Sequence, residues 1–333
     1  MDLDAFVTEH AGEWNRLQYL VGRPARRRSA AEVDEMVMLY RRTATHLSVV
    51  RSRWGDPTIV AWLTRLVLQA RAAVSPSAGF SVASVRRFFA VAFPTEVYRA
   101  GRWCLGTAAA FLAFSVVVGY FVATDPSIAA TVLTPEEIES YVSRDFEAYY
   151  SQSTHENFAA QVWLNNTILS AACLASGILV LPVLYILYVN ALNIGLAGGI
   201  MVGNGGADTF FGLITVHGLL ELTCVLVAAG VGLRVGWAWI APGPYLTRTQ
   251  SLARAGRSAT VVALGLGVWL LISGIVEGFV TPSPLPVVVK LVLGALVWLA
   301  FLSYVVIVGG AAVRQGEHAD VAAYEREVEA PSV

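Results

Sequence analysis

The chain has 333 residues and a formal net charge of −1, and 56% of its residues are hydrophobic while only 14% are charged. Soluble globular proteins carry roughly 25% charged residues, so this composition excludes an ordinary soluble protein and predicts a polytopic membrane protein. The charges are also separated along the chain. Residues 1–102 hold 15 arginines and 9 acidic residues, whereas residues 124–161 hold 7 acidic residues and one arginine. We interpret this asymmetry as a sign of membrane topology and expect no nucleic-acid partner.

Residues 1–80 show the pattern of a helical domain outside the membrane. Apolar residues recur at helical spacing through residues 3–21. Ser29 and Glu32 form a capping box that opens a second helix, and Asp56 followed by proline opens a third. We expect this domain to be cytoplasmic, with its arginine surplus facing lipid headgroups or a partner.

A basic amphipathic segment, residues 81–102, follows a linker at Ser75–Gly79. It contains the run Val85-Arg-Arg-Phe-Phe-Ala-Val-Ala-Phe93, which combines cations with aromatic residues. Such a pattern is typical of a helix that lies on a membrane surface. We therefore expect a juxtamembrane helix whose partners are membrane lipids.

The remaining apolar sequence, residues 103–313, predicts an all-α membrane domain. A spanning helix needs about 20 apolar residues, and six segments reach that length. The break between the second and third segments rests on Gly177 and Pro182, so these two segments could form one kinked element. The six segments are Trp103–Ala123, Val162–Val180, Val183–Val202, Phe210–Leu233, Ser258–Val280 and Pro286–Val313.

The distribution of arginine orients these spans, because cytoplasmic loops carry an excess of Lys and Arg. The N-terminal region and the loop 234–257, which holds four arginines, should be inside, and the acidic segment 124–161 should be outside. Six spans satisfy both conditions with both termini inside, including the charged tail 314–333, whereas five spans would place the arginine loop outside. Within the acidic segment, Thr134 caps a helix that begins at a proline.

Four ionisable side chains lie inside the apolar runs: His217, Glu221, Glu277 and Lys290. Such residues are costly in a membrane and are functional-site candidates by default. His217 and Glu221 are four residues apart and therefore share one helix face. The six-span topology places His217, Glu277 and Lys290 at similar depths in the outer half of the membrane, with Glu221 deeper.

Several roles for this cluster are consistent with the sequence. The first is a structural charge network in which Glu277 pairs with Lys290, and Glu221 pairs with His217 or with a nearby asparagine. The others are a path for a proton or an ion, a metal-assisted intramembrane enzyme, and a pocket for a lipid or cell-wall precursor. In the metal-dependent alternative His217, Glu221 and Glu277 would be the ligands, and zinc accepts this donor set. No other cofactor is expected.

Glycines recur every four residues in two of the predicted spans, and such stripes let helix backbones approach closely. We expect these glycine faces to pack helices together and to support a homodimer. The glycines are Gly195, Gly199 and Gly203 in the third span and Gly274 and Gly278 in the fifth.

Asparagines and cysteines inside the apolar runs are interpreted as packing residues. Interhelical hydrogen bonding is the expected role of the asparagines, and the cysteines should be small core residues without a disulfide. These residues are Asn165, Asn166, Asn190 and Asn193, together with Cys104, Cys173 and Cys224.

Three motifs resemble the stage II sporulation protein M family of bacterial membrane proteins, in its actinobacterial-type branch. They are Asn190-x-x-Asn193 before the glycine-rich helix, Val216-His-Gly-Leu-Leu-Glu-Leu222, and Ile275-Val-Glu-Gly-Phe-Val-Thr-Pro282. The resemblance covers about residues 80–312, although Val216 stands where the family usually has proline. Its motif positions fall here on His217, Gly218, Glu221 and Glu277, with Thr281 and Pro282 as supporting residues.

The resemblance implies an integral protein of the bacterial cytoplasmic membrane that takes part in envelope remodelling. Members of the family assemble with peptidoglycan-degrading partners, or are associated with AAA+ ATPases of the MoxR type and their von Willebrand-like or DUF58 companions. We therefore expect a non-enzymatic scaffold or assembly subunit. A transporter or channel for a small ion or an envelope precursor, and an intramembrane metal-dependent hydrolase, are the alternatives.

Overall fold

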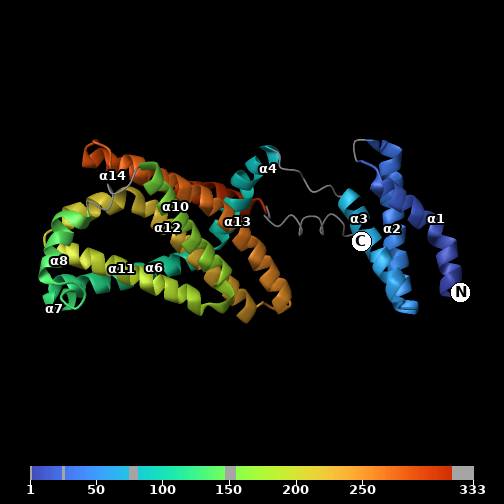
Figure 1. The fold of residues 1–333 in the computed structure, drawn as a ribbon, viewed down its shortest axis with the longest axis horizontal. Coiled ribbons are helices and arrows are strands. Elements are labelled where there is room, and N and C mark those ends of the chain that lie inside the picture. The colour runs from blue at the N-terminus through green and yellow to red at the C-terminus, as the bar shows by residue number, and fades with distance from the viewer. Residues whose placement is uncertain (1, 25–26, 75–81, 147–154, 317–333) are drawn as a thin grey trace. The chain divides into compact units, whose positions relative to one another are not determined.

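The computed structural model describes residues 2–24, 27–74, 82–146 and 155–316. The chain divides into two compact units, residues 1–85 and residues 86–333 (Figure 1). All regular structure in the described ranges is helical, which confirms the predicted all-α fold. The predicted linker Ser75–Gly79 and most of the predicted tail lie outside the described residues.

The first unit consists of three helices, α1 (Leu3–Gly22), α2 (Ala30–Arg53) and α3 (Pro57–Val74). Each begins where the sequence offers a cap, and the capping box of Ser29 and Glu32 is present at the start of α2. The helices bury one continuous apolar core between them. Its most buried large side chains are Trp14, Leu17, Leu20, Met36 and Leu63.

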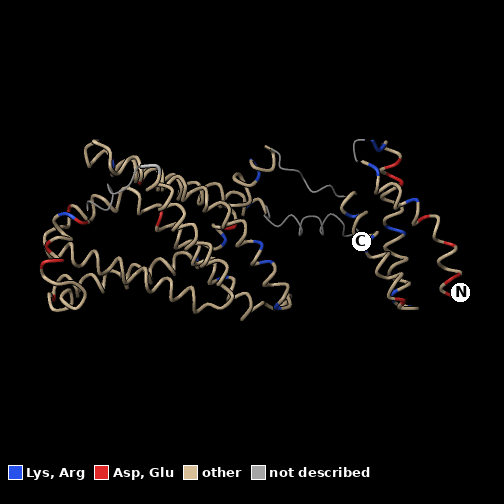
Figure 2. Tube along the Cα trace, in the orientation of Figure 1, with Lys and Arg blue, Asp and Glu red and all other residues tan. Residues whose placement is uncertain are grey.

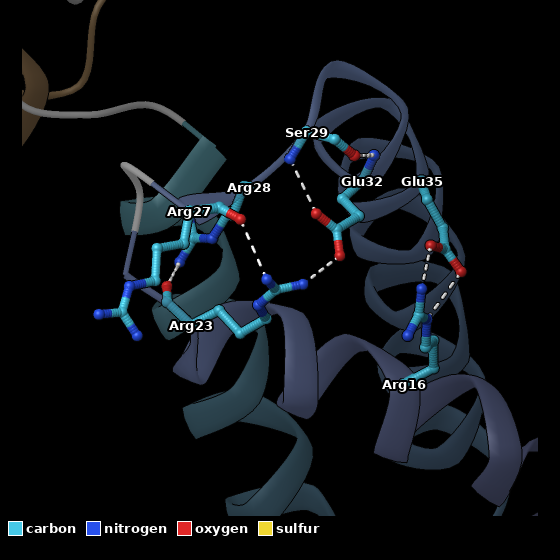
Figure 3. Close-up of polar contacts among 7 residues, drawn as sticks. All are labelled: Arg16, Arg23, Arg27, Arg28, Ser29, Glu32 and Glu35. Carbon is cyan, nitrogen blue, oxygen red and sulfur yellow. Dashed lines mark hydrogen bonds and ion pairs between the residues drawn. The ribbon is translucent and has the colours of Figure 1, made fainter.

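Ion pairs connect α1 with the beginning of α2 on the surface of this unit (Figure 3). The guanidinium of Arg16 donates two hydrogen bonds to Glu35, at 2.7 and 3.0 Å, and Arg23 contacts Glu32. The backbone N–H of Ser29 holds the pKa of Glu32 below its usual range, and the Arg16 guanidinium does the same for Glu35. Both carboxylates are therefore charged at neutral pH and fix the angle between the two helices.

The helix α4 (Val82–Arg87) crosses the boundary between the two units, and the second unit, a helical bundle, continues with the π-helical η2 (Phe88–Ala92) and α5 (Phe93–Arg99). The prediction of a surface helix for residues 81–102 is wrong for α5, whose residues 93–97 are buried. Phe93 packs against the bundle core, and Gly309 approaches the carbonyl of Pro94. The chain thus enters the bundle before its first long helix begins.

Five of the described helices are long and apolar enough to cross a membrane. They are α6 (Gly101–Thr124), α11 (Leu181–Gly203), α12 (Ala207–Ile240), α13 (Arg248–Ile275) continued by the π-helical η6 (Val276–Val280), and α14 (Val287–Ser303) continued through the π-helical η7 (Tyr304–Gly309) and α15 (Gly310–Arg314).

The second predicted span, Val162–Val180, is not among these five helices. Its residues form α10 (His155–Ala175) and the 3-10 turn η5 (Gly177–Leu179), and polar side chains such as Asn165 and Asn166 lower the hydropathy of α10. The break expected near Gly177 is real, so α10 and α11 are two separate helices.

The arrangement of the bundle nevertheless makes α10 a crossing element (Figure 1). The end of α11 packs beside the end of α6, where Gly203 approaches Ala123. The turn before α11 lies at the opposite end of the bundle, beside the last part of α12, where Gly177 approaches Gly232. The chain must therefore run from one end of the bundle to the other between residues 124 and 181. The described helix on that path that is long enough to make the crossing is α10. Together with the five long apolar helices it gives six traverses within the described residues.

The two ends of the bundle differ in charge, as Figure 2 shows. Blue segments gather where α12 ends and α13 begins, while the acidic residues around α8 (Pro135–Ser140) lie at the opposite end with α7 (Pro126–Ala129) and the π-helical η3 (Tyr141–Asp145). Thr134 caps α8 as the sequence predicted. All three cysteines are free, and Cys173 and Cys224 are buried.

Candidate functional site

The intramembrane cluster is built from three elements that meet inside the bundle. His217 and Glu221 lie one turn apart on α12, Glu277 lies in the π-helical turn η6 at the end of α13, and Asn166 lies on α10. The helices that carry these residues pack directly on one another. Depth in the membrane placed Glu277 at the level of His217, and the structure brings Glu277 into contact with His217 on α12.

His217 forms contacts through both of its ring nitrogens. Nε2 lies 3.4 Å from Oε1 of Glu277, and Nδ1 lies 3.3 Å from Oγ1 of Thr281. The side chains of His217 and Glu277 are only 6% and 5% exposed. A buried ionisable pair of this kind is stable only when its hydrogen bonds are satisfied, so Thr281 holds the imidazole in a fixed orientation.

Glu221 contacts two partners at the inner side of this pair. Nδ2 of Asn166 donates a hydrogen bond to Oε1 of Glu221, and a carboxyl oxygen of Glu221 lies within 4.8 Å of one of Glu277. Two carboxylates this close repel each other when both are charged, so Asn166 and His217 supply the hydrogen-bond donors that this pair needs.

The same three ionisable residues could hold a metal ion. One nitrogen of His217 and one oxygen each from Glu221 and Glu277 lie within 4.8 Å of one another. Oε2 of Glu277 is buried and has no hydrogen-bond partner among the described residues. Imidazole nitrogen and carboxylate oxygen are both zinc ligands, and a catalytic zinc site uses three protein ligands with a water molecule in the fourth position.

Lys290 does not form the predicted ion pair with Glu277. Its Nζ donates a hydrogen bond of 2.7 Å to the backbone carbonyl of Thr281, and no ion pair joins it to Glu277 in the described part of the chain. The carbonyl of Thr281 is left without a helical partner where η6 ends, just before Pro282, and the lysine satisfies it. Lys290 thus supports the cluster indirectly, by fixing the residue that contacts His217.

The motif glycine and the neighbouring backbone hold His217 in place. The Oγ of Ser273 donates a hydrogen bond of 3.2 Å to the carbonyl of His217, which ties α13 to α12. A Cβ added at Gly218 would lie 3.1 Å from the side chain of Ile214, and Gly278 is buried in η6.

The glycine stripe of α11 packs inside this chain. Added Cβ atoms at Gly195, Gly199 and Gly203 would approach Ser115, Val122 and Ala123 of α6, and Gly274 approaches the carbonyl of Ala159 on α10 in the same way. These faces are covered by helices of the same chain. A homodimer would therefore have to use another surface.

The two asparagines of α11 do not join helices among the described contacts. Nδ2 of Asn190 donates a hydrogen bond of 2.8 Å to the carbonyl of Ile186 on its own helix, and Asn193 is exposed. The predicted interhelical role is thus wrong for Asn190. A contact that the sequence analysis missed joins α14 to α12 instead, where Nε1 of Trp298 donates a hydrogen bond of 3.0 Å to Oγ1 of Thr223.

A second group of potential ligands, also missed from the sequence, lies in the first unit. The rings of His10 and His46 stack with their centroids 4.0 Å apart, and Glu13 lies close enough to complete a three-residue group. Nε1 of Trp14 donates a hydrogen bond of 3.1 Å to Nδ1 of His46. The available signal was the helical spacing of His10 with Phe6 and Trp14, which places it on the core face of α1.

The fold and the buried cluster define a polytopic helical membrane protein with a separate helical unit at its N-terminus. Residues 108–282 match the family model of stage II sporulation protein M, and residues 4–75 match a domain of unknown function, DUF8413. Because the first match covers more than half of the chain, the protein belongs to the stage II sporulation protein M family. Neither a curated protein nor a solved structure matches the chain.

Proposed function

We propose that this protein is a non-enzymatic membrane scaffold, an assembly subunit of the machinery that remodels the bacterial cell envelope and its peptidoglycan. The observation that carries the proposal is the separate first unit, which has a core of its own around Trp14 and Leu63. A unit with its own core can present a partner-binding surface without disturbing the bundle. The second helix offers exposed arginines for this purpose, including Arg41 and Arg51.

The bundle has a structural role in this proposal. Contacts from His217 to Glu277 and from Asn166 to Glu221 join α12 to η6 and to α10. Breaking a buried polar network is costly, so such contacts select one arrangement of the helices. We propose that the cluster fixes the outer half of the bundle and shapes an outward-facing cavity there.

The proposed location is the bacterial cytoplasmic membrane, with both termini inside. The arginine-rich end of the bundle then faces the cytoplasm and the acidic segment around α8 faces outward, as the positive-inside rule requires. The proposed partners are a second copy of the chain and envelope-remodelling proteins, including AAA+ ATPases of the MoxR type with DUF58 or von Willebrand-like companions.

Affinity capture of the tagged full chain from its bacterium tests the scaffold. We expect envelope-remodelling proteins to be captured, and the double variant Arg41→Glu/Arg51→Glu to lose them. Arg144→Glu, which reverses a charge in η3, is the matched control and should retain them. Equal capture by the unsubstituted chain and both variants contradicts the proposal. Ion flux through the protein in proteoliposomes, if Glu221→Gln abolishes it, would instead show that the protein is a transporter.

A second candidate, an intramembrane metal-dependent hydrolase, is favoured by one observation. The ligand atoms of His217, Glu221 and Glu277 lie within 4.8 Å of one another, as a bound metal ion requires. Metal analysis of the purified protein decides between the two candidates. Stoichiometric zinc that His217→Ala removes supports the hydrolase, whereas protein that binds no zinc even when zinc is supplied excludes it.

A further inference from the structure

A deep apolar groove lies between α6, α11 and α12, apart from the cluster of His217. Its volume is about 810 Å³, and its walls include Phe111 on α6 and Leu187 and Ala191 on α11. The α6 wall has a gap at Gly106, where an added Cβ would meet no atom within 4 Å. The groove is therefore wide enough for a hydrocarbon chain beside α6.

One end of the groove carries three arginines, Arg99, Arg102 and Arg234. The nearby carboxylate of Glu96 lies 3.3 Å from Nη1 of Arg99 and 4.0 Å from Nη1 of Arg234. The three arginines make this end of the groove positive, and Glu96 contacts two of them. Arginine at such a position recognises phosphate, because its guanidinium donates two parallel hydrogen bonds to the oxygens.

The hydrogen bonding of Arg234 points to an acceptor that the described residues do not supply. Its Nη1 is buried and has no hydrogen-bond partner among them, since the 4.0 Å to Glu96 is too long for a hydrogen bond. Leaving a buried charged donor unsatisfied is costly. An anionic ligand at the arginine end of the groove would remove that cost.

The length of the groove matches one leaflet of a membrane. Along α6 it runs from Arg102 to Phe114, which is roughly 18 Å at 1.5 Å per residue, and half of a bilayer core is roughly 15 Å. The rings of Trp103 and Trp237 lie 5.9 Å apart at the charged end, where interfacial tryptophans are expected. The other end is lined by Phe114 and Tyr188, whose ring centroids are 5.6 Å apart.

We propose that this groove binds an anionic membrane lipid. The phosphate of the headgroup lies between the arginines, and one hydrocarbon chain runs past Gly106 toward Phe114. The site therefore selects a lipid for two features together, a negative phosphate and a long chain. The proposal is independent of the scaffold function, because it depends only on the bundle and its membrane.

Native mass spectrometry of the full chain in detergent, titrated with phosphatidylglycerol or phosphatidylcholine, tests this site. We expect one phosphatidylglycerol to be retained in preference to phosphatidylcholine. Arg102→Gln, at an exposed position outside the bundle core, should weaken the binding about fivefold, the equivalent of about 1 kcal/mol for one cation near a membrane surface.

Gly106→Leu tests the hydrocarbon part of the site. The new side chain fills the groove without a clash and should reduce the retained phosphatidylglycerol at least tenfold. Gly267→Leu is the matched control, because a Cβ at Gly267 also meets no atom within 4 Å but lies on α13, outside the groove. Equal retention of the two lipids overturns the proposal. So does phosphatidylglycerol binding that inorganic phosphate displaces and Gly106→Leu leaves unchanged, because it would show a free phosphate site.

Discussion

Nε2 of His217 lies 3.4 Å from Oε1 of Glu277, in the interior of a bundle that spans a membrane. The two residues are 60 positions apart, on α12 and on the π-helical turn after α13. Their contact, with Thr281 on the other ring nitrogen, is one point at which polar groups hold those two elements together. The stability of the bundle should therefore depend on it.

His217→Ala should lower the stability of the bundle by about 1–3 kcal/mol, the cost of a buried polar group left unsatisfied. The substitution removes the partner of Glu277, whose Oε2 already has no hydrogen-bond partner among the described residues. The midpoint of thermal unfolding of the purified protein in detergent measures the loss. Asn193→Ala, at an exposed position of α11, is the control and should leave the midpoint unchanged. Equal midpoints for both variants would show that the pair contributes nothing.

Gly294→Leu should destabilise the contact between α14 and α12. A Cβ at Gly294 would collide with the backbone carbonyl of Val216, directly before His217, and backbone cannot move aside as a flexible side chain can. Overpacking of this kind costs about 1–3 kcal/mol. The thermal midpoint should fall, while Gly267→Leu, where a Cβ meets nothing within 4 Å, should not change it. A midpoint that Gly294→Leu leaves intact contradicts the close approach of these helices.

The first unit should become less stable below pH 6.5. Burial lowers the pKa of His46 from its ordinary 6.5, and the stacked ring of His10 lowers this pKa further. The unfolded chain therefore binds a proton more readily than the folded unit, so stability is full above pH 6.5 and is lost as the pH falls through and below that value.

Hydrogen exchange of the amides of α1 and α2, corrected for intrinsic exchange rates, measures this dependence. His46→Gln can still accept the hydrogen bond from Trp14 but cannot titrate, so its protection should fall less between pH 7 and pH 5. Protection that falls equally in both proteins would assign the pH dependence to other groups.

Cysteine labelling should place the loop after α12 inside the cell and α8 outside. Tyr245 is 94% exposed in that loop, and Glu136 is exposed in α8. A membrane-impermeant maleimide should label Glu136→Cys in intact cells, and Tyr245→Cys only after lysis. The unsubstituted chain is the control for labelling of the three native cysteines, of which Cys173 and Cys224 are buried and Cys104 is partly exposed. The opposite pattern would invert the proposed orientation.

Composition and periodicity were sufficient to predict the all-α fold, and the four-residue spacing predicted the shared face of His217 and Glu221. The depth of each apolar run placed Glu277 at the level of His217 but did not give its partner, because the sequence analysis paired Glu277 with Lys290 whereas Glu277 contacts His217. The crossing by α10 was harder to assign, because its Asn165 and Asn166 make the segment polar. Asn166 belongs to the bundle, since it contacts Glu221, whereas Asn165 is exposed.

The partner of Lys290 could not be predicted from depth. Residues 276–280 form a π-helical turn, which holds more residues per turn than an α-helix and so changes the direction of every later side chain. Glu277 thereby points to α12, and the carbonyl of Thr281 becomes available to Lys290. The hydrogen bond of Asn190 to its own helix could not be predicted either, because residue spacing does not specify which acceptor a polar side chain takes.

The turn between α10 and α11 has a mechanical consequence. Val180 has φ of 61°, a left-handed conformation that costs a β-branched residue roughly 1–3 kcal/mol, so neighbouring contacts must hold it there. Its side chain occupies the space that Gly236 leaves open on α12, and Gly177 meets Gly232 one turn away. The α10–α11 turn is thus held against α12 by close backbone contacts. A displacement of α12 along its axis would therefore either move this turn as well or allow Val180 to leave its strained conformation.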